Sequence, residues 1–176
     1  MLRVTNVQED SQRPCIVEIN SYVPISFRSQ NQPIGGARYI RLGDFKTRLL
    51  ELQLPSESLV VSGFTLVSVE GSLQDALVGQ GPSIVGLPAI SMPQGQDFSG
   101  RIPRLDIQTE IALFCGDGQV EVRLGAAEIF NRRVVHRRVQ FLLLDDVLVG
   151  LRVVDLSEVE QQTLRGYVAQ HPSQVY

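Results

Sequence analysis

Arginines gather at one place in the sequence, where four of them fall within seven residues: Arg132, Arg133, Arg137 and Arg138. A guanidinium group presents a rigid fork of N–H donors that matches a phosphate or a carboxylate, so such a cluster could bind an anion. The commoner use of a charged run is a solvent-facing strand, where the charge also discourages aggregation. On a strand, Arg132 and Arg138 would share one face. Arg133 and Arg137 would then point to the opposite face.

The basic residues of the chain are almost all arginine. Lys46 is the only lysine among the 16 basic residues. A GC-rich genome is the simpler interpretation of this bias, and the bias would also suit bidentate recognition of phosphates or carboxylates. The net charge of −3 gives no general attraction to nucleic acid polymers or to acidic lipid, so we expect neither as a partner.

No catalytic constellation is evident in the sequence. His136 and His171 are the only histidines, so the sequence contains no His-x-x-x-His metal pattern. No third group is obviously placed to orient His136 as a base. The adjacent acids Asp145 and Asp146 fall in a predicted turn, where solvated charge is ordinary. We therefore expect a protein that is not an enzyme and that uses no metal or other cofactor.

The two cysteines and the N-terminal residues bear on the cellular compartment. Cys15 and Cys115 both lie in apolar, strand-like runs and form no CxxC or zinc pattern. A single disulfide is one alternative, and a pair of reduced thiols is the one that we favour. The N-terminus lacks the apolar core of a signal peptide, and no run approaches the roughly 20 apolar residues of a membrane helix. The sequence therefore predicts a cytoplasmic protein without a membrane span.

Alternating apolar residues predict that the chain is mainly β. Residues 15–27 and 105–115 are each apolar at most odd positions, and their central residues are similar in type, which hints at an internal duplication. Residues 59–69 are apolar on both faces and suit a central strand. The runs 139–144 and 147–154 predict a tight hairpin. Strands this numerous, with short polar turns, indicate an antiparallel β-barrel or a sandwich.

A segment rich in glycine and proline divides the chain. Residues 79–100 contain five glycines and three prolines, which is typical of a loop or a linker. We therefore predict an N-terminal β domain or half at 1–80, a connection at 81–99, and a β-barrel segment with a C-terminal helix at 100–176.

The C-terminal segment carries the clearest helix signal. Ser157 is a natural N-cap, and Glu160 three residues later completes a capping box. Apolar side chains at helical spacing then fall on one face with Val159, namely Leu164, Tyr167 and Val168 together with Thr163. Pro172 stops the helix, so we expect it to span about 157 to 170.

The end of the chain resembles the PilZ family. Residues 147–169 resemble the end of a PilZ domain, in which the last barrel strand runs into an Asp-Leu-Ser turn and then an acidic helix. The stretch Arg101-Ile-Pro-Arg104-Leu105 resembles the one that opens the first PilZ strand. The resemblance covers residues 100–170 and implies a six-stranded antiparallel barrel with a C-terminal α-helix. The first half would then be a second, more degenerate copy.

The resemblance also implies a ligand, the bacterial messenger cyclic di-GMP, which PilZ domains bind through Arg-x-x-x-Arg and Asp/Asn-x-Ser-x-x-Gly motifs. Arg104 matches the second arginine of the first motif, while Gly100 stands at the position of the first and Arg101 beside it. Arg133 and Arg137 have the same spacing. The expected ligand residues are therefore Arg101, Arg104, Arg133 and Arg137.

Glu160 stands where the second motif has its glycine, after Asp155 and Ser157, and a carboxylate repels phosphate. We therefore expect a non-catalytic signalling or adaptor module that binds a bacterial protein partner, with cyclic di-GMP as the alternative ligand. A rival hypothesis is a structural or assembly β-sandwich subunit of a larger bacterial complex, in which an exposed edge strand around Pro24 serves subunit contacts and oligomers. A third is an enzyme or carrier that uses the barrel mouth as a pocket.

Overall fold

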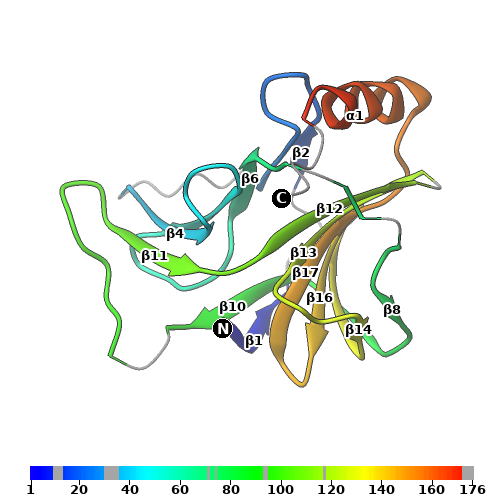
Figure 1. Ribbon diagram of the computed structural model, residues 1–176. Helices are drawn as coiled ribbons and strands as arrows, with labels where there is room; N and C mark the ends of the chain where they lie inside the picture. Colours follow the sequence, from blue (N-terminus) through cyan, green and yellow to red (C-terminus); the bar gives the residue numbers. More distant parts are fainter. Residues whose placement is uncertain are drawn as a thin grey trace.

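Strands dominate the chain and form two main sheets (Figure 1). The computed structural model describes residues 1–9, 14–29, 36–70, 72–73, 75–92, 95–116 and 118–171. The nine-stranded sheet contains β1 (Arg3–Gln8), β7 (Ser72–Leu73), β9 (Ser83–Val85), β10 (Leu87–Ser91), β12 (Ile111–Gly116), β13 (Gln119–Leu124), β15 (Arg132–His136), β16 (Val139–Leu144) and β17 (Val147–Val153). The six-stranded sheet contains β2 (Cys15–Glu18), β3 (Ile25–Ser29), β4 (Ala37–Gly43), β5 (Leu49–Pro55), β6 (Gly63–Ser68) and β11 (Arg104–Gln108). The remaining elements are the short pair β8 (Val78–Gly79) and β14 (Ile129–Phe130) and the helix α1 (Glu158–Gln170).

The two sheets share one hydrophobic core. Along β5, Leu50, Leu52 and Leu54 alternate with half-buried residues and are themselves fully buried. Across the core, the ring of Phe27 on β3 meets the ring of Phe141 on β16 edge to face, with centroids 6.3 Å apart. Because β3 and β16 belong to different sheets, this ring pair joins the two layers.

The prediction of a mainly β protein with a C-terminal helix is confirmed. The sheets are not antiparallel throughout, because β11 pairs in parallel with β4, β9 with β15, and β7 with β12. The partners in these parallel pairs lie far apart in the sequence, as parallel pairing requires a crossover connection. The nine-stranded sheet curls across the molecule (Figure 1).

Two runs that read as single strands in the sequence are each divided in the structure. Residues 15–27 provide β2 and the start of β3, which pair with each other across a turn. Residues 105–115 provide β11 in the six-stranded sheet and then β12 in the nine-stranded sheet. The two-residue alternation does not break at Thr109 and Glu110, where the chain passes from one sheet to the other. The pattern therefore does not reveal the change of sheet.

The segment 81–99, predicted as a connection, contributes two strands. β9 pairs with β15, and β10 pairs with β1. Leu87 is buried in the core, so apolar contact holds the segment in place despite its glycines and prolines. Pro88 donates no hydrogen bond, but its carbonyl accepts one from the Val61 N–H at 2.9 Å. The division of the chain into two domains around this segment stays a prediction.

The predicted hairpin between β16 and β17 is confirmed, and the two strands pair antiparallel. Its turn residues Asp145 and Asp146 have φ values of 49° and 65°. A tight two-residue turn of this kind requires the left-handed region, which aspartate adopts more readily than most residues. The turn therefore brings two carboxylates to one end of the sheet.

The helix α1 begins where the sequence predicts it. Ser157 is the N-cap, and both hydrogen bonds of the capping box with Glu160 are present. The helix ends at Gln170, while Pro172, the predicted stop, lies outside the described residues.

One face of α1 packs on the β structure. Leu164 and Tyr167 are buried, and the Tyr167 hydroxyl accepts a hydrogen bond from the Val69 N–H at 3.3 Å. Val159 was predicted on this face and is instead 72% exposed. It lies about 140° around the helix from Leu164, at 3.6 residues per turn, and so points away from the packed side.

Candidate functional site

The arginine cluster lies on β15 and on the tight turn that joins it to β16. His136 and Val139 are a cross-strand pair, so Arg137 and Arg138 are the two turn residues. Arg137 has a φ of 57°, in the left-handed region that such turns use. Val134 and His136 are buried in the core. The alternation predicted for the four arginines therefore ends at His136, and the cluster is divided between a strand and a turn.

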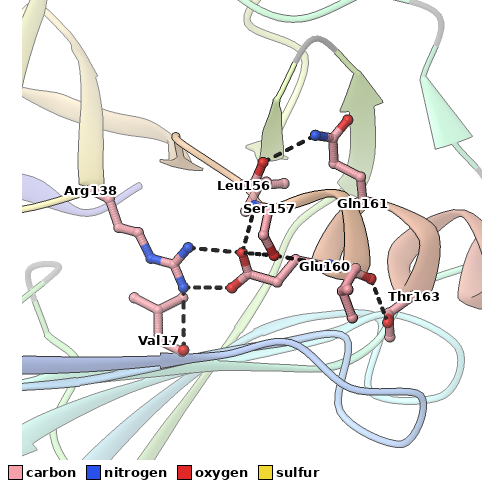
Figure 2. Close-up of polar contacts among 8 residues, drawn as sticks. Val17, Arg138, Leu156, Ser157, Glu160, Gln161 and Thr163 are labelled. Atoms are coloured by element: carbon pink, nitrogen blue, oxygen red, sulfur yellow. Dashed lines mark hydrogen bonds and ion pairs between the residues drawn. The ribbon is translucent and has the colours of Figure 1, made fainter.

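Arg138 bridges three elements (Figure 2). Its two terminal nitrogens donate to the Glu160 carboxylate at 2.6 and 3.1 Å, and one of them also donates to the Val17 carbonyl of β2 at 3.4 Å. The hydrogen bond from Arg138, followed by those from Ser157, lowers the pKa of Glu160 to about 2 despite partial burial. This arginine therefore ties the start of α1 to the β15–β16 turn and to the edge of β2.

Arg132 is also paired with an acid. Its guanidinium donates to the carboxylate of Asp146 in the β16–β17 turn. Beside it, the Asn131 side-chain amide donates to the Asp145 carboxylate at 2.9 Å. The two exposed acids of the turn therefore attach it to the start of β15.

The four arginines predicted to bind cyclic di-GMP fall into two groups. Arg101 lies exposed in a turn, and Arg104 lies exposed at the start of β11 in the six-stranded sheet. Arg133 is half-buried on β15 of the nine-stranded sheet, and Arg137 is exposed in the turn that follows this strand. Arg137 lies four positions after Arg133, which corresponds to at most about 13 Å at the rise of a strand. The structure thus places the two groups on different sheets, and their role in binding stays a prediction.

An open groove of about 660 Å³ lies beside β2 and the β15–β16 turn. Over the described ranges, β2 is the last strand in the order of its sheet, and β3 is its partner there. Ile16 of β2 is 44% exposed. The groove is lined by Pro14, Cys15, Ile16, Val17, Arg137 and Arg138. An apolar strand edge and two guanidinium groups therefore border the same space.

Cys15 in this groove and Cys115 on β12 are free thiols. Burial raises the pKa of Cys15, and the charges of Arg137 and Arg138 offset only part of that rise. Burial raises the pKa of Cys115 to about 11, against the smaller opposing charge of Arg165. Because the thiolate is the reactive form, neither cysteine is activated as a nucleophile.

A second charged pair is buried on the outer face of the nine-stranded sheet. Glu121 on β13 is completely buried and accepts hydrogen bonds from Nε and Nη2 of Arg152 on β17, at 2.8 and 2.6 Å. The Leu77 N–H donates to the other Glu121 oxygen at 2.6 Å, and the Leu77 carbonyl accepts from Arg152 at 3.0 Å. The Arg152 guanidinium also lies 5.2 Å from the centre of the Phe130 ring. The pair therefore holds the chain around Leu77 across the sheet.

Sequence reasoning missed this pair. Glu121 and Arg152 each alternate with buried apolar residues, as solvent-facing residues of a strand do. They are direct cross-strand neighbours, and that register is decided by the sheet.

No model of a known protein family matches the chain, and neither does any curated protein. Over the residues that the structure describes, no three His, Cys, Asp or Glu side chains cluster as a metal site would require. Within those same ranges, no helix has both the length and the apolar character needed to cross a membrane.

Proposed function

We propose that this chain is a non-catalytic signalling or adaptor module that binds a partner protein along the edge of β2. The observation that carries the proposal is the meeting of a strand edge and two arginines in one open groove. An extended peptide adds to a strand edge through main-chain hydrogen bonds, and neighbouring side chains then select its sequence.

The outer edge of β2 offers main-chain groups to such a peptide. The Val17 carbonyl accepts from Arg138 at 3.4 Å, which is long for a hydrogen bond. A peptide strand can replace this contact while Arg138 keeps its ion pair with Glu160. Because alternate residues of a strand direct their main-chain groups to the same edge, those of Cys15 point the same way as those of Val17.

The charges around the groove favour an acidic partner. Arg137 and Arg138 both line the groove, Arg137 at an exposed position, and Arg138 is ion-paired with Glu160. Exposed Ile16 adds an apolar contact. The fitting partner is an extended segment in which acidic residues alternate with aliphatic ones, since arginine pairs bidentately with carboxylates.

The resemblance of residues 100–170 to PilZ domains is part of this proposal. Degenerate members of that family act as protein-interaction modules, and the mainly β fold with its capped C-terminal helix accords with such an origin. A PilZ-type barrel, tandem copies and a cytoplasmic bacterial setting belong to the same proposal.

Cyclic di-GMP is the second candidate ligand. Arg133 and Arg137 have the Arg-x-x-x-Arg spacing, and the buried Nε of Arg133 has no hydrogen-bond partner within the described ranges. Phosphate oxygens would supply acceptors there. Arg101 and Arg104, on the other sheet, would form the second pair of ligand residues in this alternative.

Selection of random peptides by display on the purified chain tests the main proposal. We expect enriched peptides to be extended and acidic, and to bind at least about tenfold more weakly to R137E, because the variant reverses one groove charge. R104E changes another exposed arginine, on the other sheet, and is the matched control that should bind normally. Equal losses in both variants, or enrichment without acidic residues, would refute the proposal.

Calorimetric titration with cyclic di-GMP separates the alternatives. Tight binding that is lost in R133Q and R137Q, without an acidic peptide preference, would make the chain a messenger receptor. A stable oligomer that responds to neither ligand would favour the assembly-subunit hypothesis.

A further inference from the structure

A second open groove lies on the outer face of the nine-stranded sheet, separate from the groove beside β2. It has a volume of about 670 Å³. Phe114 of β12 and Gln119 and Arg123 of β13 line it from the sheet, and the exposed acids Asp75 and Glu128 line it from neighbouring loops. A groove of this size suits a small molecule, and its side chains combine an aromatic ring, an amide and both signs of charge.

Among the residues that the structure describes, Arg123 has no ion-pair partner. Its cross-strand neighbours are Ala112 and Gly150, which have no polar side chains. Its buried Nε has no hydrogen-bond acceptor, and no carboxylate within the described ranges forms an ion pair with it. Arg152 on the neighbouring strand is, by contrast, fully paired with Glu121. A half-buried guanidinium without an acceptor is placed to receive one from a ligand.

The wall of the groove is held in place before any ligand binds. Leu77 is fastened through both of its main-chain polar groups to the buried pair of Glu121 and Arg152. The next residue, Val78, donates its N–H to the Glu128 carbonyl at 3.0 Å. A preformed wall lowers the entropy that a ligand would otherwise lose on ordering the site.

The charges of the groove decide what kind of ligand fits. Asp75 and Glu128 contribute two negative charges and Arg123 one positive charge, so a simple anion would be repelled by the two acids. We propose that the groove binds an amino-acid-like zwitterion. Arg123 takes the carboxylate in a bidentate pair, the two acids face the ammonium group, and Phe114 contacts an apolar side chain. Free amino acids and short peptides both carry these groups and differ in their separation.

The test uses NMR of the whole chain, with the Arg123 Nε–H and the Gln119 side-chain amide as reporters. The probes are L-leucine, L-phenylalanine and the dipeptide Ala-Leu, together with N-acetyl-leucine, leucinamide and inorganic phosphate. We expect saturable shifts with at least one zwitterion. Blocking either of its charged ends should weaken binding by about tenfold or more, since each end loses a charge-assisted contact. Stronger binding by Ala-Leu than by leucine would identify peptides as the source.

Substitutions in the groove test whether it is the zwitterion-binding site. R123Q should abolish the shifts, while R28Q, at an exposed position on β3 of the other sheet, should leave them unchanged. E128Q should weaken the binding of leucine but not that of N-acetyl-leucine, which has no ammonium group and which the Glu128 charge repels. A purely structural role of Glu128 would not produce this asymmetry. The proposal is overturned if no zwitterion shifts the reporters at millimolar concentration, if phosphate binds as well as leucine, or if R123Q binds like the wild type.

Discussion

Arg138 and Glu160, which lie 22 residues apart in the sequence, form a two-point ion pair at 2.6 and 3.1 Å. The same carboxylate accepts hydrogen bonds from the main chain and the hydroxyl of Ser157, at 2.8 and 2.9 Å. One glutamate thus caps α1 and anchors the helix to the β15–β16 turn (Figure 2). The arginine cluster therefore has a structural role, and two of its members, Arg137 and Arg138, also border the groove beside β2.

Loss of this pair should destabilise the fold. In E160Q the capping hydrogen bonds can persist while the charge of the pair is lost, and we expect a decrease of about 1–2 kcal/mol in the free energy of unfolding. Urea denaturation measures this change. E158Q, in the same helical turn but at an exposed position, is the matched control and should stay within about 0.5 kcal/mol of the wild type. Equal effects of the two variants would contradict the role given to Glu160.

Acid should remove the contribution of Glu160 to the stability of the fold over a defined range of pH. Its pKa of about 2 in the folded chain lies below the value of about 4.3 for an unfolded glutamate, so the unfolded chain takes up the proton first. The stabilisation is complete well above pH 4.3 and is lost as the pH falls towards 2. Unfolding measured across this range should give a flatter pH dependence for E160Q than for the wild type. The same pH dependence of stability in E160Q and in the wild type would contradict the lowered pKa of Glu160.

Asp44 in the β4–β5 turn should likewise contribute stability that is lost in acid. Burial opposes its ionisation, but hydrogen bonds from the main-chain N–H groups of Lys46, Thr47 and Arg48 prevail and hold its pKa well below the usual range. D44N should therefore be less stable than the wild type at pH 7 and approach it in acid. A difference that is independent of pH would show that the turn needs only the shape of the side chain.

Breaking the buried ion pair of Glu121 and Arg152 should destabilise the fold more than breaking the more exposed ion pairs. R152M leaves a buried carboxylate without its partner, and we expect a loss of about 3–5 kcal/mol in the free energy of unfolding. The double variant E121L/R152M should lose less than R152M alone, because no charge is left unpaired. Hydrogen exchange at Val78 should accelerate in R152M, since the Leu77 carbonyl loses the donor that holds it. An R152M protein as stable as the wild type would contradict this account.

The two thiols should differ in reactivity. At pH 8 we expect iodoacetamide to modify Cys15 faster than Cys115, because the pKa of Cys115 is raised to about 11 by burial, whereas two arginines partly offset the rise at Cys15. Mass spectrometry of the native chain over time measures both rates. C15S should leave only the slow reaction, and a fast reaction in C15S would contradict the prediction.

Local signals in the sequence determined a substantial part of the fold. The capping box of Ser157 and Glu160 and the turn at Asp145 and Asp146 depend on residues within one or two turns of chain, so the sequence alone specifies them. The alternation of buried leucines on β5 likewise follows from the two-residue period of a strand.

The assignment of strands to sheets was decided by the tertiary structure. Alternation reports which face of a strand is buried and not which neighbour the strand pairs with, so the division of 105–115 between two sheets and the strands within 81–99 were not predictable. The same limit hid the pairing of Glu121 with Arg152, whose register only the sheet supplies.

For the candidate sites, too, the sequence supplied one part of the information and the tertiary structure the other. By itself the sequence identified a cluster of arginines and the anion chemistry that guanidinium groups allow. Only the tertiary structure decided which of them are paired, because Asp146 and Glu160 approach Arg132 and Arg138 from distant parts of the chain. It also placed Arg123 between Ala112 and Gly150, two cross-strand neighbours without polar side chains. Charge is a property of the residue, whereas the partner of a charge is a property of the fold.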